Sequence, residues 1–264
     1  MPTAQINDAE LYYRIEGSGP PLLLIAGLGA NAEAWGAALP FLREHFTCIV
    51  YDSRGTGRSS VTDGPYRIDQ LADDAVALVR TLGMAPLAAV GWSLGGSVLQ
   101  SALIRHGDVF TRGVLLNTFP NYTPLQHAWL DCILALRDTG TERAAQLAFA
   151  LGWTMSPGFL SDHAKVMRRA ELIEAAPNAT TNAGYRAQAE AVRVYDSRAD
   201  LNRITAPTLV LCGAQDVLTP RAQSEEIARL VPGATLRELP QGGHVMAQEF
   251  PRETTQAIID YLKQ

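Results

Sequence analysis

The feature that most constrains the fold of this chain is the pentapeptide Gly-Trp-Ser-Leu-Gly at residues 91–95. An apolar run, residues 87–90, comes directly before it, and a second largely apolar run, residues 97–99, begins just after it. This pattern predicts a sharp turn, with Ser93 at its centre, that joins a buried strand to a helix. Glycines suit such a turn because the serine backbone must take a sparsely populated conformation, and a side chain at either glycine would collide with the adjoining strand or helix.

A serine at this turn lies at the N-terminus of the following helix. The N–H group of Leu94 has no partner within that helix, and the positive end of the helix dipole lies at the same point. Both features can stabilise negative charge that develops on a carbonyl oxygen beside the serine. Ser93 is therefore a candidate nucleophile, and Leu94 is a candidate backbone donor to an oxyanion.

Short apolar runs recur along the chain and predict the strands of a central sheet. They are residues 22–26, 47–51, 87–90, 114–116 and 208–212. Since these runs lack polar alternation, the strands should be buried on both faces, as in a parallel sheet covered by helices. Residues 4–15 alternate more and lead into a turn at 17–21, which suits an antiparallel pair at the sheet edge. The expected fold class is α/β, with a mostly parallel central sheet and helices on both faces.

Residues 119–200 differ from the rest of the chain, because their apolar residues recur with helical periodicity and form no convincing buried strand. A helical block between two core strands would lie over the ends of the sheet. We therefore expect a core of residues 1–118 and 201–264 and a helical lid of residues 119–200. The apolar aromatic residues of the block favour a cover over a pocket; they include Trp129, Phe149, Trp153 and Phe159. An ordinary helical layer on one face of the sheet is the alternative.

Length and charge narrow the class of protein. A chain of 264 residues with 47% hydrophobic residues can bury one sizeable core, so we expect one domain with an insertion. The formal net charge is -5, from 22 basic and 27 acidic side chains that are scattered along the chain. This composition offers no basic field for phosphates and argues against nucleic acid as a partner.

The cysteines and apolar runs indicate the compartment. Cys48, Cys132 and Cys212 lie far apart in the sequence, and the first and last of them lie inside apolar runs, where a free cysteine acts as a small hydrophobic residue. Residues 1–10 do not combine a basic stretch with an apolar one, and no apolar run approaches the roughly 20 residues of a membrane span. We expect a soluble, cytoplasmic protein with no disulfide framework and no membrane partner.

A serine hydroxyl is a poor nucleophile until a base removes its proton, and the base needs a third group that holds its tautomer. Asp216 follows the predicted strand 208–212, and His244 follows the predicted strand 235–239 through a pair of glycines. Both positions suit loops at the carboxyl end of a parallel sheet. Ser93, Asp216 and His244 are therefore the candidate catalytic triad, in the chain order Ser, Asp, His.

The rival residues are less well placed. Two other histidines end predicted helices and two lie in the helical insertion; these are His45, His106, His127 and His163. Two rival acids, Asp196 and Asp200, precede the strand 208–212 rather than follow it. His244 and Asp216 remain the preferred base and acid.

Two glycine-containing loops have different predicted roles. The loop after residues 22–25 should supply the second oxyanion donor, and the N–H of Leu28 is the candidate to act with that of Leu94. The turn at residues 52–59 lacks both the Gly-x-Gly-x-x-Gly pattern and the lysine of a phosphate-binding loop. We therefore interpret that turn as structural, with Asp52 and Arg54 in local hydrogen bonds.

Taken together, these residues resemble the α/β-hydrolase superfamily over essentially the full chain. The resemblance rests on Tyr-Tyr-Arg at 12–14, Asp-x-Arg-Gly-x-Gly-x-Ser at 52–59, the serine turn and Gly-His at 243–244. Within the superfamily, the chain is most similar to lidded carboxylesterases and 3-oxoadipate enol-lactonases. Two positions depart from many relatives: Ala26 replaces a histidine that organises the oxyanion loop, and Asn117 stands where some relatives carry a substitute acid.

The resemblance implies a serine hydrolase that cleaves a small carboxylic ester or lactone through an acyl-enzyme, without a metal or an organic cofactor. It implies a small-molecule substrate, for which Trp92, Trp129 and Trp153 are candidate contacts. Carbon–carbon bond hydrolysis, perhydrolysis or amide cleavage on the same triad are the alternatives within the enzyme class. A non-catalytic ligand receptor with the hydrolase fold and a purely structural protein are the alternatives outside it.

Overall fold

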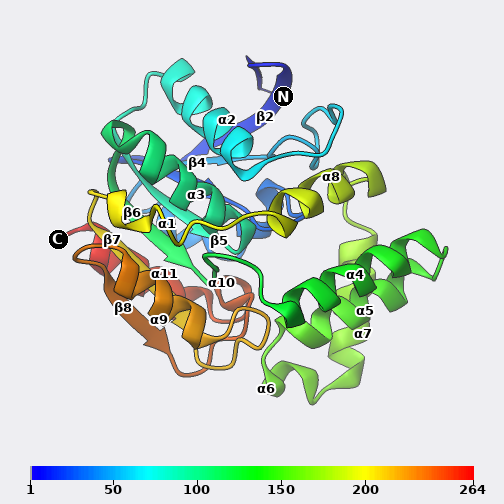
Figure 1. Ribbon diagram of the computed structural model, residues 1–264. Helices are drawn as coiled ribbons and strands as arrows, with labels where there is room; N and C mark the ends of the chain where they lie inside the picture. The colour runs from blue at the N-terminus through cyan, green and yellow to red at the C-terminus, as the bar shows by residue number, and fades with distance from the viewer. Residues whose placement is uncertain (1) are drawn as a thin grey trace.

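The computed structural model describes residues 2–264, which contain one eight-stranded sheet (Figure 1). Its strands are β1 (Thr3–Ile6), β2 (Ala9–Glu16), β3 (Pro21–Ile25), β4 (Thr47–Tyr51), β5 (Leu87–Trp92), β6 (Phe110–Leu116), β7 (Thr208–Gly213) and β8 (Thr235–Leu239). Their order in the sheet is β1-β2-β4-β3-β5-β6-β7-β8. All pairs from β4 to β8 are parallel, whereas β1 pairs with β2, and β2 with β4, in antiparallel fashion. The predicted α/β class with a mostly parallel sheet is confirmed.

Helices cover both faces of this sheet, and a further group lies between β6 and β7. The flanking helices are α1 (Leu39–Leu42), α2 (Ile68–Thr81), α3 (Leu94–Arg105), α9 (Arg221–Leu230), α10 (Met246–Glu249) and α11 (Pro251–Leu262). The inserted helices are α4 (Pro124–Asp138), α5 (Arg143–Thr154), α6 (Pro157–Leu160), α7 (His163–Glu174) and α8 (Asn182–Arg193). Short 3-10 turns lie at η1 (Ala32–Trp35), η2 (Gly107–Val109) and η3 (Leu201–Arg203).

Strand β3 illustrates why its apolar run is continuous. Leu23 and Ile25 pack into a core with residues of α2 and α3, and Leu22 and Leu24 pack into a second core with residues of α1 and α11. All four side chains are fully buried, although successive residues of a strand point to opposite faces. Burial of one such side chain contributes about 1.5–3 kcal/mol. The two cores hold the sheet between two helical layers.

The predicted antiparallel pair at the sheet edge is present as β1 and β2, with Thr3 opposite Tyr12. Its turn lies at Asn7, whose φ is 53°. The glycine-rich segment before β3 has another role, because it leads from β2 to β3 and these two strands are separated by β4.

The glycine-rich turn after β4 is held by side-chain hydrogen bonds and ion pairs. Asp52 accepts hydrogen bonds from the N–H of Ala32 at 2.8 Å and from the N–H and Nε of Arg58 at 2.8 and 2.9 Å. Arg54 is fully buried, and its guanidinium pairs with Asp74 of α2 at 2.6 Å and with Asp8 at 2.6 Å. Asp52 thus has the expected local bonds to Arg58 and a further one to Ala32 outside the turn. The expectation of local bonds for Arg54 is corrected, because its side chain joins the turn to α2 and to the β1–β2 turn.

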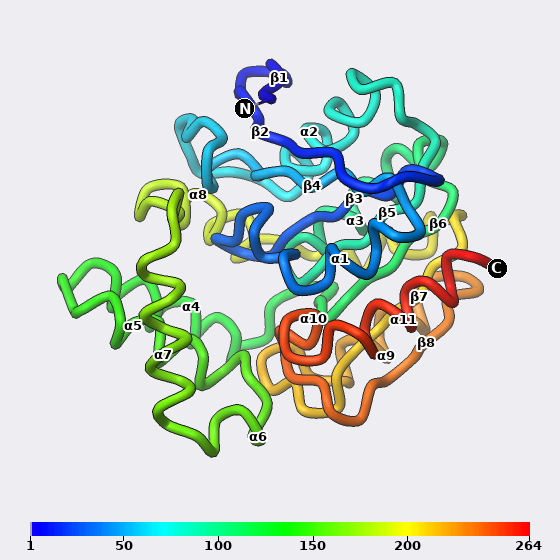
Figure 2. Tube along the Cα trace, turned by 180° about the vertical axis from the view of Figure 1, so that it is seen from behind, coloured from blue at the N-terminus to red at the C-terminus, as the bar shows by residue number. Residues whose placement is uncertain are grey.

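The inserted helices are arranged in two parts. Helices α4 to α7 form a group beside the sheet, and α8 returns to lie beside the segment that follows β3 (Figures 1 and 2). A small core joins α5 and α7 to the loop after β8 through Leu151, Met155, Ala170 and Val245. Across the described residues 119–200, the only strand pairing is a single bridge between Asn121 and Asp196, in keeping with the expected helical block. In residues 2–264, no helix combines the length and the apolar character that crossing a bilayer requires.

The buried cysteines give a test of this packing. Burial raises the pKa of the Cys48 thiol to about 12 and that of Cys212 to about 11, so both thiols stay protonated and covered at pH 8. Cys132 is exposed. We expect a chromogenic disulfide reagent to titrate one thiol in the native protein and all three after unfolding in guanidinium chloride, because the thiolate is the reacting form. Cys132→Ser should remove the native signal, and a second fast-reacting thiol in that variant would contradict the packing.

Candidate active site

Ser93 occupies the turn between β5 and α3, with φ 56° and ψ -122°. This conformation is unusual for a residue with a side chain and presents Oγ at the start of the helix. Glycine is required at positions 91 and 95 because neighbouring backbone lies too close for a side chain. A Cβ at position 91 would overlap the carbonyl of Gly95, and a Cβ at position 95 would overlap the carbonyl of Ile25. The predicted strand-to-helix turn is confirmed, with α3 packed directly against the end of β3.

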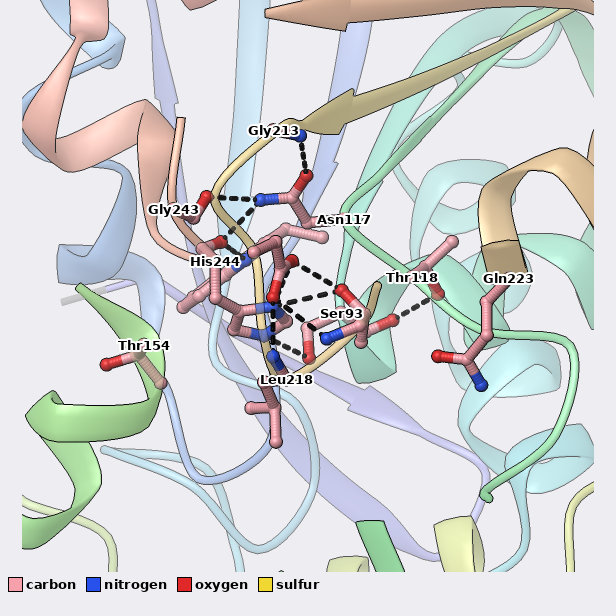
Figure 3. Close-up of polar contacts among 12 residues, drawn as sticks. Ser93, Asn117, Thr118, Thr154, Gly213, Leu218, Gln223, Gly243 and His244 are labelled. Atoms are coloured by element: carbon pink, nitrogen blue, oxygen red, sulfur yellow. Dashed lines mark hydrogen bonds and ion pairs between the residues drawn. The ribbon is translucent and has the colours of Figure 1, made fainter. Parts of the chain in front are cut away.

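The structure brings the three predicted triad residues together. Figure 3 shows Ser93 beside His244. Ser93 Oγ lies 3.0 Å from His244 Nε2, and His244 Nδ1 lies 2.8 Å from Asp216 Oδ2. The side chains come from the loops after β5, β7 and β8. All three residues are buried, since Ser93 is 8% exposed, Asp216 5% and His244 3%. A continuous line of hydrogen bonds therefore leads from the serine hydroxyl to the carboxylate.

The Asp216 carboxylate is fixed by its own loop. Its Oδ1 accepts the backbone N–H groups of Leu218 at 2.9 Å and Thr219 at 2.8 Å. Its Oδ2 accepts the hydroxyl of Thr219 at 2.5 Å, and that hydroxyl also lies 3.1 Å from His244 Nδ1. These donors fix the orientation of the carboxylate, so that Oδ2 faces the imidazole. Thr219 was not predicted from the sequence, although its position three residues after the acid is typical of such side-chain turns.

The rival histidines and acids have other contacts. His45 lies 3.0 Å from Lys263 Nζ, and His106 lies 2.7 Å from a carboxylate oxygen of Asp73. His127 packs on the Tyr122 ring, and His163 is the exposed first residue of α7. Asp196 pairs with Arg198 at 2.5 Å, and Asp200 pairs with Arg203 at 3.1 Å. Among the described residues, His244 is the histidine that meets Ser93.

Asn117, at the carboxyl end of β6, joins two of the catalytic loops. Its Nδ2 donates to the carbonyls of Gly243 and His244 at 2.7 and 2.8 Å, and its Oδ1 accepts the N–H of Gly213 at 3.0 Å (Figure 3). The side chain is fully buried and its φ is 41°. An amide at this position is suited to hold the His244 loop against the end of β7, because it donates and accepts at once.

Trp92 supports the same loop from the other side. Its Nε1 donates to the carbonyl of His244 at 2.9 Å, and its ring lies 5.8 Å from the imidazole between centroids. The His244 carbonyl thus accepts from both Trp92 and Asn117, which fixes the backbone that carries the imidazole.

Two backbone N–H groups beside Ser93 remain free. Within residues 2–264, neither Leu28 nor Leu94 donates its N–H to an acceptor. Leu94 is the first residue of α3, and Gly27 is close enough to Ser93 that an added Cβ would lie 3.2 Å from the serine Cβ. The loop that carries Leu28 therefore passes beside the candidate nucleophile, as a pair of oxyanion donors requires.

A cavity of about 400 Å³ opens onto Ser93 and His244. The other side of this cavity is formed by helices of the insertion, and its apolar lining includes Leu28, Trp92, Tyr122, Trp129, Leu147, Leu151, Met155 and Ile173. Burial raises the pKa of the Tyr122 hydroxyl, which therefore stays protonated at neutral pH. The volume suits a small organic molecule.

Two of the three predicted tryptophan contacts, Trp92 and Trp129, line this cavity, and Trp153 does not. The cavity face of α5 is formed by Leu147, Ala150, Leu151 and Thr154, which follow helical spacing. At 100° per residue, position 153 falls well off this face, and Trp153 packs on the Phe149 ring instead. The expectation for Trp153 as a cavity contact is therefore corrected.

The chain matches the family model described as alpha/beta hydrolase fold over residues 20–251. The chain belongs to the alpha/beta hydrolase family. This alpha/beta hydrolase is 31% identical over 263 residues to 3-oxoadipate enol-lactonase 2 of Acinetobacter baylyi, a match that covers 99% of this chain and 96% of that protein. It is 33% identical over 257 residues to a protein of Variovorax paradoxus that bears the name carbamate hydrolase RutD, with 96% of each chain covered.

The solved structures agree on the fold. The enol-lactonase from Burkholderia xenovorans LB400 superposes with a TM-score of 0.87 at 29% identity, and the whole of each chain is covered. The resemblance to the α/β-hydrolase superfamily inferred from the sequence is thus confirmed, and with it the coarse assignment of the chain to the hydrolases.

The three hydrogen bonds of Asn117 predict a specific loss. Asn117→Ala should lower the free energy of unfolding by roughly 2–4 kcal/mol, because buried partners on two loops are left unsatisfied. Urea unfolding measures this effect. Asn117→Asp, which keeps an acceptor for the Gly213 N–H but has no donors when ionised, should also be destabilised. Wild-type stability in both variants would show that Asn117 does not hold the His244 loop.

Proposed function

We propose that this alpha/beta hydrolase is a serine hydrolase that cleaves small carboxylic esters or lactones. The observation that carries the proposal is the hydrogen-bond line from Ser93 through His244 to Asp216 at the wall of a largely apolar cavity. The free N–H groups beside Ser93 and the enol-lactonase relatives add support. Residues 1–118 and 201–264 act as the catalytic core in this proposal, and residues 119–200 act as a lid over the substrate.

The chemistry follows from the contacts of each group. As Ser93 Oγ attacks the carbonyl carbon, its proton passes to His244 Nε2, and the Asp216 carboxylate stabilises the imidazolium through Nδ1–H. The carbonyl oxygen becomes an oxyanion that accepts from the N–H groups of Leu28 and Leu94, each worth about 3 kcal/mol in comparable sites. His244 then protonates the leaving alkoxide, and an ester bond joins the acyl group to Ser93.

Hydrolysis of the acyl-enzyme reverses these roles. His244 accepts a proton from water, the resulting hydroxide attacks the acyl carbon, and the bond to Ser93 Oγ breaks as the serine regains its proton. For a lactone, the departing alcohol and the released acid belong to one product molecule. Trp92 and Trp129 contact the substrate from the two sides of the cavity.

The charges that line the cavity narrow the substrate further. Arg143 of α5 and Arg169 of α7 line the cavity, and neither forms an ion pair with another described residue. Among the described residues that line the cavity, the one carboxylate, Glu33, is already paired with Arg14 and Arg58 at 3.3 and 3.1 Å. Two uncompensated guanidinium groups favour a substrate with a carboxylate, as in the lactone of a dicarboxylic acid.

A second candidate reaction is cleavage of a carbamate, which the match to proteins named carbamate hydrolase RutD favours. The same triad would attack a carbamate carbonyl, with an amine or ammonia in place of the alcohol as the leaving group. Hydrolysis of matched ester, lactone and carbamate substrates separates the two candidates, because a higher kcat/KM for the carbamate would overturn the preference for esters and lactones.

The first test is Ser93→Ala on a panel of p-nitrophenyl esters and small lactones. The variant should lose turnover by roughly 10⁴- to 10⁶-fold while its thermal unfolding stays close to wild type. Ser97→Ala, one turn further along the same buried helix, is the matched control and should keep its turnover. A serine-directed phosphonate should add once to the wild type and not to Ser93→Ala. Equal turnover in Ser93→Ala and wild type would eliminate the proposal.

The preference for an anionic substrate is tested by Arg143→Met and Arg169→Met. Each should raise KM for a lactone that carries a carboxylate by about tenfold, because a charge-assisted hydrogen bond is lost. KM for a neutral lactone of similar size should change less than about twofold on the same reasoning. Arg168→Met, which alters the exposed neighbour of Arg169 on α7, is the control. Equal effects on both lactones would assign the arginines a purely structural role.

A further inference from the structure

The loop beside Ser93, residues 26–31, packs against the core through Ala26, Leu28 and Ala30 and is hydrogen-bonded to the insertion. We call it the oxyanion loop. The N–H of Gly29 donates to Gln188 Oε1 at 3.0 Å, and the carbonyl of Gly29 accepts from Thr180 Oγ1 at 2.8 Å. Both polar backbone atoms of the residue next to Leu28 are therefore taken by side chains of α8 or the segment before it. This arrangement agrees with the position of α8 beside the segment after β3 (Figure 2).

Gln188 is itself rigidly placed. It lies in the middle of α8 and is fully buried, and its Nε2 donates to the carbonyl of Arg54 at 3.1 Å. The Arg54 side chain is anchored by its ion pair with Asp74. The amide of Gln188 thus bridges the loops that follow the neighbouring strands β3 and β4.

Direct packing adds to these hydrogen bonds. The Tyr185 ring of α8 lies against the α-carbon of Gly29, whose φ is 67°, and an added Cβ would overlap the ring. Ala26, at the start of the oxyanion loop, has no polar side chain with which to hold the loop from the core side. The polar contacts that hold Gly29 therefore come from α8 and the segment before it.

We infer that Gln188 and Thr180 are positioning residues that set the direction of the Leu28 N–H toward the oxyanion. The inference rests on the proposed serine hydrolase, since it concerns the transition state of that reaction. An oxyanion donor acts only when it is fixed before the reaction, and removal of one donor costs about 10²- to 10³-fold in kcat. A loop that is loosened but still present should cost less than a donor that is removed.

The test uses Gln188→Met in the full-length protein, because methionine keeps the length of the side chain and makes neither hydrogen bond. We expect kcat for a good ester substrate to fall about 10- to 100-fold, while KM stays within about threefold. The matched control is Gln100→Met. Gln100 is also a fully buried glutamine of a helix. Its side chain donates to the carbonyl of Phe119 and accepts a hydrogen bond from Ser197. Gln100→Met should lose stability without the fall in kcat.

A second pair of variants covers the case in which Gln188→Met does not fold. Thr180→Val removes the hydroxyl that holds the Gly29 carbonyl and keeps the shape of the side chain, and Thr180→Ser restores the hydroxyl. Thr180→Val should lower kcat by about tenfold, and Thr180→Ser should remain close to wild type. Equal activity of the Val and Ser variants would contradict the role of Thr180.

Hydrogen–deuterium exchange gives a readout that does not depend on activity. In Gln188→Met, amides of the oxyanion loop should exchange about tenfold faster, while those of β5 and α3 keep their wild-type rates. Wild-type kcat and loop exchange in a folded Gln188→Met protein would overturn the inference, and so would an equal fall of kcat in Gln100→Met. If wild type lacks turnover, the proposed function fails, and the exchange rates still decide whether Gln188 holds the loop.

Discussion

The close approach of α3 to the end of β3 is the constraint on which the site depends. The helix begins directly after Ser93, and its first turn passes so near the β3 carbonyls that position 95 has no room for a side chain. Ser93 consequently has a positive φ, and its hydroxyl is directed toward His244 at the carboxyl edge of the sheet. The cost of this unfavourable conformation is offset by the burial of β5 in both cores and of α3 in the first of them.

Around this turn, neutral amide side chains join loops at the carboxyl edge of the sheet. Asn117 links the end of β7 to the loop after β8, and Gln188 links the loops after β3 and β4. Each amide is fully buried and uses both its donor and its acceptor. An amide can join two backbone segments without placing a charge near the imidazole, which an ionised carboxylate at the same position would do. The loops are thereby fixed before any substrate enters.

Much of this site follows from the chain order of a few residues. The apolar runs predicted the parallel strands, and parallel strands place the loops that follow them at one edge of the sheet. Ser93, Asp216 and His244 each follow a strand, so their meeting could be predicted without knowledge of side-chain positions. Trp153 was different, because the cavity face of α5 depends on how the insertion packs on the core. A stretch with apolar residues on several sides does not reveal which side that is.

The sequence by itself determined the α/β class, the strand-to-helix turn at Ser93 and the three residues of the hydrogen-bond line, because each depends on local pattern and chain order. The tertiary structure alone decided which side chains hold the loops and which arginines reach the cavity. Gln188 and Gly29 are 159 positions apart, and Asn117 and Gly243 are 126 apart. Contacts over such separations are selected by the packing of whole helices and strands, and no periodicity along the chain records that packing.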